Sequence, residues 1–480
     1  FDYARAAHRV EATEEGICFV PELGPALRLR STVPLQIADG DAIAEWTLPA
    51  GESATFVLEE ARPGEASPAS APHYAADTFK ATSNFWRRWI GRSSYRGLWR
   101  DEVHRSALVL KLLTSEKHGS VVAAPTFGLP EAVGGVRNWD YRYTWIRDAS
   151  FTLYALIRLG MTEETEAFMR WIEARCAEPN PVGSPLQALY GLDGRHELPE
   201  TTLDHLDGYL GSRPVRIGNA AHAQLQLDIY GALIDSVYLY DKYGQTIGYD
   251  SWCNVRNLVE WVCENWRQPD EGIWEVRGGR RQFVHSRLMC WAALDRAVRL
   301  ARKRSLPAPL DRWLAVRDQI YESIWQEFWN PELGAFVQYP GAQSLDASVL
   351  LMPLLRFVSP TDPRWLSTLA AVGGTLMDDS LVYRYRTGSG ADDGLPNGEG
   401  TFSICSFWYV ECLSRSGDLQ QARFLFEKML SYANHVGLYA EELGPSGEHL
   451  GNFPQAFTHL ALISAAYDLD RRLSGAGWEA

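Results

Sequence analysis

The run from Arg137 to Asp148 contains the first residues whose types and spacing could do chemistry. It reads Arg-Asn-Trp-Asp-Tyr-Arg-Tyr-Thr-Trp-Ile-Arg-Asp and ends directly before an apolar helical pattern. Arg147 and Asp148 are adjacent, and a guanidinium can donate to a ring oxygen while a carboxylate accepts from two hydroxyls. Beside four aromatic rings, this pair indicates a site for a polyol. The same Asp could instead cap the helix, and the pair could be a structural ion pair.

Two carboxylates, Glu271 and Glu275, flank Trp274 in one short loop. Contact with an indole removes water from a carboxyl group, which raises its pKa and suits the group to donate a proton. A general acid at either position is therefore one interpretation, and a solvated acidic loop is the other.

A second acidic pair, Glu441 and Glu442, lies between an apolar run and a loop rich in Gly and Pro. Hydrolysis needs a carboxylate that is held near a water molecule and takes its proton, and either residue could do this. Surface charge is again the plain alternative. Arg384, in the run Tyr-Arg-Tyr-Arg, could add a cationic donor to the same pocket.

Other catalytic chemistries find little support in the sequence. It lacks the Gly-x-Ser-x-Gly, P-loop and His-Glu-x-x-His patterns. Neither the cysteines nor the histidines have metal-ligand spacing. We therefore predict no cofactor and no metal. A terpene cyclase would need an Asp-rich metal motif, which Asp392 and Asp393 do not complete.

Composition narrows the classes of partner. The net charge of -14 argues against nucleic acid or an anionic membrane as partner. No run of about 18 apolar residues could cross a bilayer. The 18 Trp exceed ordinary core needs and point to surfaces that stack on sugar rings or enclose an apolar ligand. The tryptophans thus favour a small-molecule carbohydrate substrate. The seven scattered cysteines fit reduced thiols, so we predict a cytoplasmic protein.

Helices must carry these segments, because apolar residues recur with a helical period from residue 75 onward. The pattern predicts a short helix at 75–90 and then twelve main helices. Antiparallel pairing of twelve helices fits two concentric rings of six, an (α/α)6 barrel. The sequence has no fixed repeat, which argues against a solenoid. The predicted main helices cover residues 102–116, 148–160, 163–176, 220–243, 251–267, 285–304, 309–328, 344–357, 364–378, 401–415, 418–434 and 454–472.

Long loops separate several of these helices and hold most of the residues named above. Loops of such length are usually functional or disordered, and these are not of low complexity. If the helices alternate in direction, many of the loops gather at one end of the barrel and build a pocket there. The loops cover residues 117–147, 177–219, 268–284, 379–400 and 435–453.

Residues 1–61 have a different pattern, with apolar alternation that predicts strands at 16–20, 26–30, 43–48 and 55–58. A few strands cannot bury both faces of a sheet alone. We therefore expect part of an N-terminal β-sandwich, with a further piece of the domain preceding Phe1. Residues 62–74, rich in Pro, Ala and Ser, are predicted to be a linker, and residues 75–480 the catalytic barrel.

At these segments the sequence resembles glycoside hydrolase family 15, which includes glucoamylases, glucodextranases and bacterial trehalases. Tyr141-Arg-Tyr-Thr-Trp-Ile-Arg-Asp148 is similar to the family's substrate-binding motif. Tyr439-Ala-Glu-Glu442, with the later Asn452-Phe-Pro-Gln-Ala-Phe, is similar to its C-terminal base motif. The resemblance covers about residues 75–472 and is strongest for the bacterial branch with a trehalase-like β-domain.

The resemblance implies an exo-acting, inverting hydrolase that releases glucose from α-glucosides. The family's general acid corresponds to Glu275 and its general base to Glu441. The acid protonates the departing oxygen while the base deprotonates water on the opposite face, which requires roughly 6.5–9.5 Å between the two carboxyl groups. Fungal members read Trp-Glu-Glu where this chain reads Trp-Glu-Val, and this departure leaves Glu271 as a rival for the acid.

The sugar-binding residues follow from the same resemblance. Arg147 and Asp148 correspond to the pair that binds the non-reducing glucose, and Tyr141 to the residue that supports the charged transition state. The other pocket residues are Arg384, Trp139, Trp145 and Trp274. The branch favours α,α-trehalose as substrate, with α-1,4- or α-1,6-linked gluco-oligosaccharides as the alternative and a non-catalytic sugar-binding barrel as a more distant one.

Overall fold

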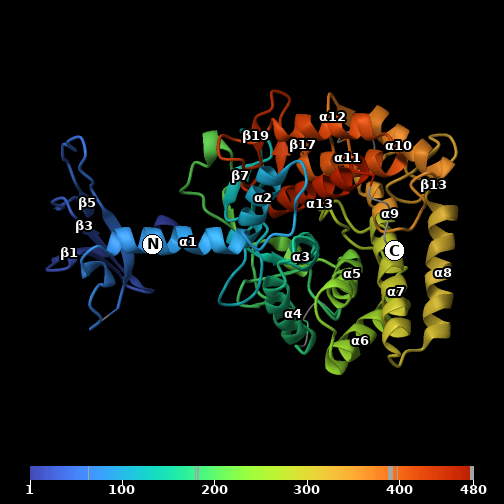
Figure 1. The fold of residues 1–480 in the computed structure, drawn as a ribbon, viewed down its shortest axis with the longest axis horizontal. Helices are drawn as coiled ribbons and strands as arrows, with labels where there is room; N and C mark the ends of the chain where they lie inside the picture. Colours follow the sequence, from blue (N-terminus) through green and yellow to red (C-terminus); the bar gives the residue numbers. More distant parts are fainter. Residues whose placement is uncertain (63, 179, 181–182, 387–392, 397, 476–480) are drawn as a thin grey trace. The chain divides into compact units, whose positions relative to one another are not determined.

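The computed structural model describes the chain except for residues 63, 179, 181–182, 387–392, 397 and 476–480. Asp392, considered above for a metal motif, lies outside the described residues. The chain forms two compact units, Phe1–Gly91 and Arg92–Ala480 (Figure 1). The limits predicted for the β-domain, linker and barrel remain predictions.

The first unit contains a four-stranded antiparallel sheet in the order β1-β2-β3-β6. A hairpin of β4 (Gln36–Ala38) and β5 (Asp41–Ile43) lies between β3 and β6 in sequence, and α1 (Tyr74–Ile90) ends the unit. Within the sheet, buried Arg28 pairs with Glu15 and with Glu59. The strands of the sheet are β1 (His8–Thr13), β2 (Gly16–Pro21), β3 (Ala26–Ser31) and β6 (Phe56–Ala61).

Three of the four predicted strands are confirmed, at β2, β3 and β6. The predicted strand at 43–48 is wrong beyond Ile43, because the hairpin of β4 and β5 ends there and residues 44–49 join no described strand. Strand β1 went unpredicted, since charged residues alternate there on a largely exposed edge.

The second unit is an (α/α)6 barrel, so the predicted mainly α-helical fold is confirmed. Its inner helices contact one another in a closed ring, and an outer helix precedes each inner one along the chain (Figure 1). The inner ring consists of α3 (Ile146–Arg158), α5 (Asp228–Tyr243), α7 (Val284–Arg304), α9 (Leu351–Leu354) with its preceding 3-10 turn, α11 (Ser403–Ser416) and α13 (Ala456–Leu473). The outer ring consists of α2 (Arg100–Leu112), α4 (Glu163–Cys176), α6 (Tyr249–Asn265), α8 (Leu310–Glu327), α10 (Pro363–Thr375) and α12 (Leu419–Leu430).

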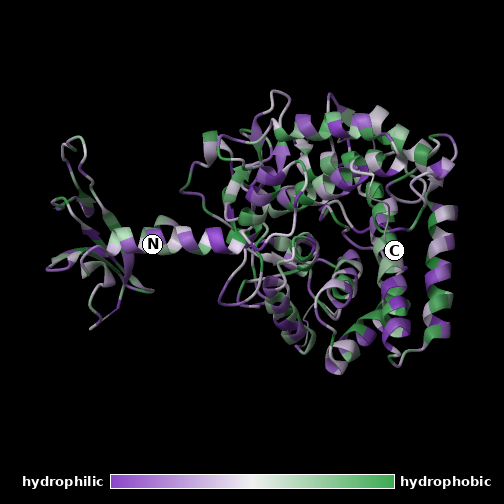
Figure 2. Ribbon diagram, viewed as in Figure 1, coloured by the Kyte–Doolittle hydropathy of each residue, from purple (hydrophilic) through white to green (hydrophobic). Residues whose placement is uncertain are grey.

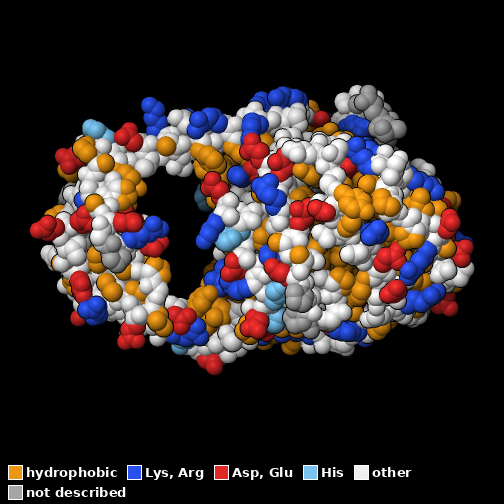
Figure 3. Space-filling model, turned by 90° about the horizontal axis from the view of Figure 1, so that it is seen from below, with side chains coloured by type: hydrophobic (Ala, Val, Ile, Leu, Met, Phe, Trp, Pro, Cys, Tyr) orange, Lys and Arg blue, Asp and Glu red, His pale blue; other side chains and the backbone are white. Residues whose placement is uncertain are grey.

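Burial explains which helices lie inside. Residues of α11 are buried on all sides from Ser403 to Arg415, whereas α12 buries one stripe spaced by three or four residues. Figure 2 shows polar and apolar residues alternating along the outer helix α8. Charged side chains of both signs are interspersed on the face seen in Figure 3. Among the described residues, no helix combines the length and apolar character that a membrane crossing needs.

Each of the twelve predicted main helices matches a helix of the barrel, with two differences. The helix predicted at 220–243 begins at Asp228, because Asn219 caps a separate 3-10 turn at Ala220–Ala223. The helix predicted at 344–357 is a 3-10 turn, Ala347–Leu350, followed by the single turn α9, which contains Pro353. Proline lacks the N–H that a longer helix would use at that position.

Short antiparallel strand pairs brace the long loops near the first residues of inner helices. In the loop before α3, β7 (Phe127–Pro130) pairs with β8 (Asn138–Asp140). Next to α3, β9 (Thr144–Trp145) pairs with β10 (Leu189–Tyr190). Other loops form the sheet β17-β18-β19 and the pair β11-β12, from Thr401–Phe402, Glu442–Leu443, His449–Leu450, Thr201–Thr202 and Arg216–Ile217.

The inner ring depends on a close approach between α5 and α7 at Gly231. A Cβ atom at this position would lie 2.2 Å from the backbone oxygen of Met289. We predict that Gly231→Ala lowers the free energy of unfolding by about 1–3 kcal/mol, because the two helices must move apart. Gly374→Ala in α10 is the matched control, since a Cβ there meets no atom within 4 Å. Chemical denaturation measures both, and equal stability of the two variants would contradict the prediction.

Candidate active site

One cavity at the end of the barrel where the inner helices begin brings together all nine residues predicted for the site. Each of the five predicted loops contributes to its lining, so the expectation that loops gather at one end is confirmed. Glu271, the rival acid, does not line it: its carboxylate pairs with Arg280 and accepts from the backbone N–H of Leu225. The nine lining residues are Trp139, Tyr141, Trp145, Arg147, Asp148, Trp274, Glu275, Arg384 and Glu441.

A buried ion cluster lies around Arg147 at the start of α3. Its guanidinium is 3.2 Å from Asp148, 3.5 Å from Asp228 at the start of α5, and 3.4 Å from Glu275 in the loop before α7. Burial alone would lower the pKa of Arg147, but the three carboxylates raise it above its ordinary value. The cation therefore holds three segments of the inner ring together at the cavity.

Glu275 lies in the left-handed backbone region, with a φ of 56°, which is strained for a residue with a Cβ. Its Oε1 accepts hydrogen bonds from Trp145 Nε1 at 2.6 Å, Gln226 Nε2 at 3.2 Å and Arg147 at 3.4 Å. No described residue donates to Oε2, and the side chain keeps 21% of its surface exposed. One oxygen is thus fixed while the other is available to a ligand.

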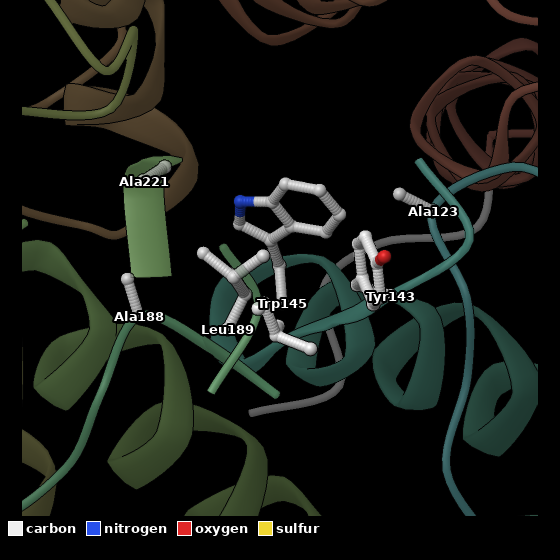
Figure 4. Close-up of a cluster of buried hydrophobic side chains, with 7 residues drawn as sticks. Ala123, Tyr143, Trp145, Ala188, Leu189 and Ala221 are labelled. Atoms are coloured by element: carbon white, nitrogen blue, oxygen red, sulfur yellow. The ribbon is translucent and has the colours of Figure 1, made fainter. Parts of the chain in front are cut away.

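Trp145 owes its position to a cluster of buried apolar side chains. It pairs with Leu189 across β9 and β10, and Figure 4 shows its ring among Tyr143, Ala188 and Leu189. Tyr141 packs against this cluster, edge-on to the Trp145 indole at 5.5 Å. The cluster explains how a motif rich in aromatics can aim an indole N–H at a carboxylate.

Glu441 immediately precedes strand β18 and is almost completely buried. Its Oε1 accepts from the Tyr141 hydroxyl at 2.7 Å and from Gln455 Nε2 at 3.1 Å. Gly451, with a φ of 74°, packs against the carboxylate, and a Cβ there would come within 2.5 Å of Oε2. Burial raises the pKa of Glu441 well above its usual value, although the hydrogen bond from Tyr141 acts in the opposite direction.

The remaining wall of the cavity is aromatic and cationic. Trp274 donates from Nε1 to Asp346 at 3.0 Å and packs against Phe402 at 5.3 Å between ring centroids. Trp139 donates to Glu131 at 2.7 Å, and the Arg277 guanidinium covers its ring at 4.4 Å. These contacts fix the ring planes before any ligand arrives.

Arg384 belongs to a buried charge network rather than standing free in the cavity. It pairs with Glu399 at 2.5 Å, and Arg137 pairs with Asp393 at 2.8 Å and with Glu399 at 3.2 Å. Burial raises the pKa of Glu131, which lies between the two arginines, to about 6. The network places cations beside the carboxylates of this wall.

One group of carboxylates among the described residues has the spacing of a metal site: Glu131, Glu399 and Glu442, whose oxygens lie within 4.8 Å of one another. Arg137 and Arg384 already neutralise two of them. A metal ion would have to compete with these arginines, so we assign no metal to the group.

Several residues of the site carry no sequence signal of their own. Gln226 and Glu131 hold Glu275 and Trp139 in place, yet each is a single polar residue in an ordinary loop. Gln455 is the exception, because it lies in the Asn-Phe-Pro-Gln segment that resembles the base motif. Asp346 is recognisable only from the structure, through its contact with Trp274.

The geometry is that of a protein that cleaves glycosides. An Arg–Asp pair and aromatic walls suit a sugar ring, and two carboxylates from different loops line the same cavity. Solved structures support the fold: a bacterial glucoamylase complexed with acarbose has a TM-score of 0.72 at 15% identity, covering 96% of this chain and 74% of that one. A glucoamylase from Saccharomycopsis fibuligera has a TM-score of 0.58 at 15% identity, covering 78% and 95%.

Residues 97–467 match the family described as Glycosyl hydrolases family 15. The trehalase of Mycobacterium tuberculosis is 41% identical to this chain, covering 98% of it and 70% of that protein. The trehalase of Thermoplasma acidophilum is 40% identical, covering 81% of this chain and 66% of that protein. The chain therefore belongs to glycosyl hydrolases family 15 and is a glycoside hydrolase.

The buried ion cluster predicts how stability depends on pH. Burial raises the pKa of Asp148 to about 7, although Arg147 lowers it. As the pH rises, the unfolded chain ionises this group first, so its contribution to stability is present below about pH 4 and is lost towards about pH 7. Asp148→Asn stays neutral, so its melting temperature relative to the parent should rise between about pH 5 and about pH 8. A constant difference would contradict the assigned shift.

Proposed function

We propose that this enzyme hydrolyses α,α-trehalose to two molecules of glucose with inversion at the attacked carbon. The observation that carries the catalytic part is that Glu275 and Glu441, from loops far apart in sequence, line one cavity with the Arg147–Asp148 pair. Support for the substrate comes from relatives named trehalase at 40–42% identity. Hydrolysis of α-1,4- or α-1,6-linked gluco-oligosaccharides is the alternative, since glucoamylases share the fold.

Binding of the first glucose falls to Arg147 and Asp148. The carboxylate accepts from sugar hydroxyls and the guanidinium donates to sugar oxygens, while Trp139, Trp145 and Trp274 enclose the ring. Because Arg147 already contacts Asp148, a sugar meets a pair whose orientation is set in advance.

Glu275 acts as the general acid in this proposal. With Oε1 fixed by Trp145 and Gln226, Oε2 is the atom that delivers a proton to the glycosidic oxygen as its bond to the anomeric carbon breaks. The departing glucose leaves with that proton as a complete hydroxyl. Arg384, with its network, and the aromatic wall border the space for the departing sugar.

Glu441 acts as the general base. It takes a proton from the water whose oxygen forms the new bond to the anomeric carbon on the opposite face. Tyr141 and Gln455 orient the carboxylate. In this proposal the Tyr141 oxygen also stabilises the carbon that becomes positively charged in the transition state. A raised pKa makes Glu441 a stronger proton acceptor.

We further propose that the enzyme works in the cytoplasm. All seven cysteines are free, and four of them are buried. Thiols left unpaired in this number suit a reducing compartment.

A rate panel over α,α-trehalose, maltose and isomaltose tests the substrate, with the anomers of glucose followed by NMR. We expect trehalose to be hydrolysed fastest and to release β- and α-glucose in equal amounts at first, because one ring is inverted and the other keeps its configuration. Initial release of α-glucose alone would contradict inversion. A higher rate on maltose or isomaltose would move the assignment to the alternative.

Substrates with different leaving groups separate the two carboxylate roles. Both Glu275→Gln and Glu441→Gln should reduce trehalose turnover by about 10²–10⁴-fold, because each removes one proton transfer. α-Glucosyl fluoride needs little protonation to depart, so Glu275→Gln should retain most activity on it while Glu441→Gln does not. The reverse pattern would exchange the two roles. Glu271→Gln serves as the control and should remain active on both.

The hydroxyl of Tyr141 should set the acidic limb of the pH profile. Glu441 must be ionised to accept a proton, so activity falls as the pH drops through its raised pKa. Tyr141→Phe removes a hydrogen bond that lowers this pKa, and the acidic limb of kcat/KM should therefore move to higher pH. Tyr143→Phe, in the same aromatic cluster but without contact to Glu441, should leave the limb in place. An unmoved limb in Tyr141→Phe would show that another group controls it.

A further inference from the structure

A second cavity lies at the opposite end of the barrel, among the C-terminal halves of the inner helices. Its volume is about 380 Å³, against about 80 Å³ for the catalytic cavity, and it falls within the size range of small-molecule sites. Arg158 at the end of α3, Lys242 in the last turn of α5 and Tyr467 of α13 all line it. We call it the distal cavity.

The charge of the distal cavity is opposite to that of the whole chain. Among the described residues, seven Lys or Arg side chains and two carboxylates line it, whereas the net charge of the protein is -14. Both carboxylates are occupied: Asp235 pairs with Arg296 at 2.6 Å, and Glu411 pairs with Arg415 at 2.5 Å. Asp295 and Asp468, which do not line the cavity, also pair with Arg296, Arg299 and Arg415. The surplus of positive charge left for a ligand is therefore smaller than the lining alone suggests.

Arg158 and Lys242 carry this surplus. Neither forms an ion pair with a described residue, and Arg158 Nη1 is buried without a hydrogen-bond partner among the described residues. A buried donor without a partner is costly unless a ligand or water satisfies it. Burial lowers the pKa of Arg158, and the nearby carboxylates of Glu411 and Asp468 oppose this shift without reversing it.

Aromatic rings surround these two cations. The Arg158 guanidinium lies over the Tyr154 ring at 4.2 Å and the Tyr467 ring at 5.0 Å, and Lys242 Nζ lies over Tyr243 at 5.1 Å. Such stacking fixes the guanidinium plane while leaving its edge free to donate. The rest of the lining includes further aromatic and leucine side chains that could cover an organic ring.

We propose that the distal cavity binds a small organic phosphate monoester. Its dianionic phosphate accepts hydrogen bonds from Arg158 and Lys242, because a guanidinium fork and an ammonium are the donors that phosphate oxygens prefer. The sugar or base attached to the phosphate packs on the aromatic and leucine walls.

Two pairs of aromatic rings connect the distal cavity with the catalytic cavity. Trp408 lines the distal cavity and lies 6.4 Å from Trp274 of the catalytic cavity, between ring centroids. Phe151 and Phe457 repeat the arrangement at 6.0 Å. A ligand that contacts Trp408 or Phe151 therefore touches rings that pack against those of the sugar site.

Calorimetric titration of the full chain tests the proposal with matched pairs of probes: AMP and adenosine, and ribose 5-phosphate and ribose, with inorganic phosphate as a further probe. We expect at least one phosphate ester to bind about tenfold or more tightly than its uncharged partner, since the charged hydrogen bonds are absent from the latter. A preference for AMP identifies a nucleotide, and equal binding of both esters identifies a sugar phosphate. Inorganic phosphate binding as tightly as the esters, or no phosphate compound binding at all, would overturn the proposal.

Charge-removing variants locate the site. Lys242→Gln and Arg158→Gln should each weaken binding of the ester by about tenfold or more. Lys242→Gln is the decisive variant because its side chain is partly exposed and its removal leaves the fold intact, as circular dichroism would check. Lys117→Gln, an exposed residue outside both cavities, controls for the loss of one charge. Unchanged affinity in Lys242→Gln would place the ester elsewhere and refute the assignment, whatever the substrate of the catalytic cavity.

Discussion

The catalytic end of the barrel depends on one buried cation. Arg147 contacts carboxylates from the start of α3, the start of α5 and the loop before α7. Removing one member of such a cluster leaves uncompensated charge in a dry environment, so the cluster is rigid even where its net stabilisation is small. The same cation therefore holds Asp148, the proposed sugar-binding carboxylate, and Glu275, the proposed acid, in a fixed relation.

The parts of the protein that the sequence predicts well share a physical cause. Inner and outer helices differ in how much of their surface is apolar, so periodicity locates them all, and the long polar loops between them locate the cavity. The prediction of helix bounds fails where a capping residue or a proline determines the length of the helix, as at Asn219 before α5 and Pro353 within α9. Local hydrogen bonding outweighs apolar periodicity at these points.

The residues proposed to react were easier to predict from the sequence than the residues that support them. Glu275, Glu441 and the Arg147–Asp148 pair lie in distinctive segments, whereas Gln226 and Glu131 are ordinary polar residues whose partners come from distant parts of the chain. A hydrogen bond between segments that are far apart in sequence leaves no local pattern. Supports of this kind become visible only when the fold brings the two partners together.

The backbone at Glu275 sets catalysis against stability. A left-handed φ of 56° is easily adopted by glycine and tolerated by asparagine, but it strains a glutamate. Selection for thermal stability alone would therefore replace glutamate at this position, although glycine and asparagine could not deliver the proton that we propose for Glu275. If thermostable relatives keep glutamate at this position, they have remained under selection for turnover. The residue found at this strained position therefore indicates whether a barrel of this kind is still under selection as an enzyme.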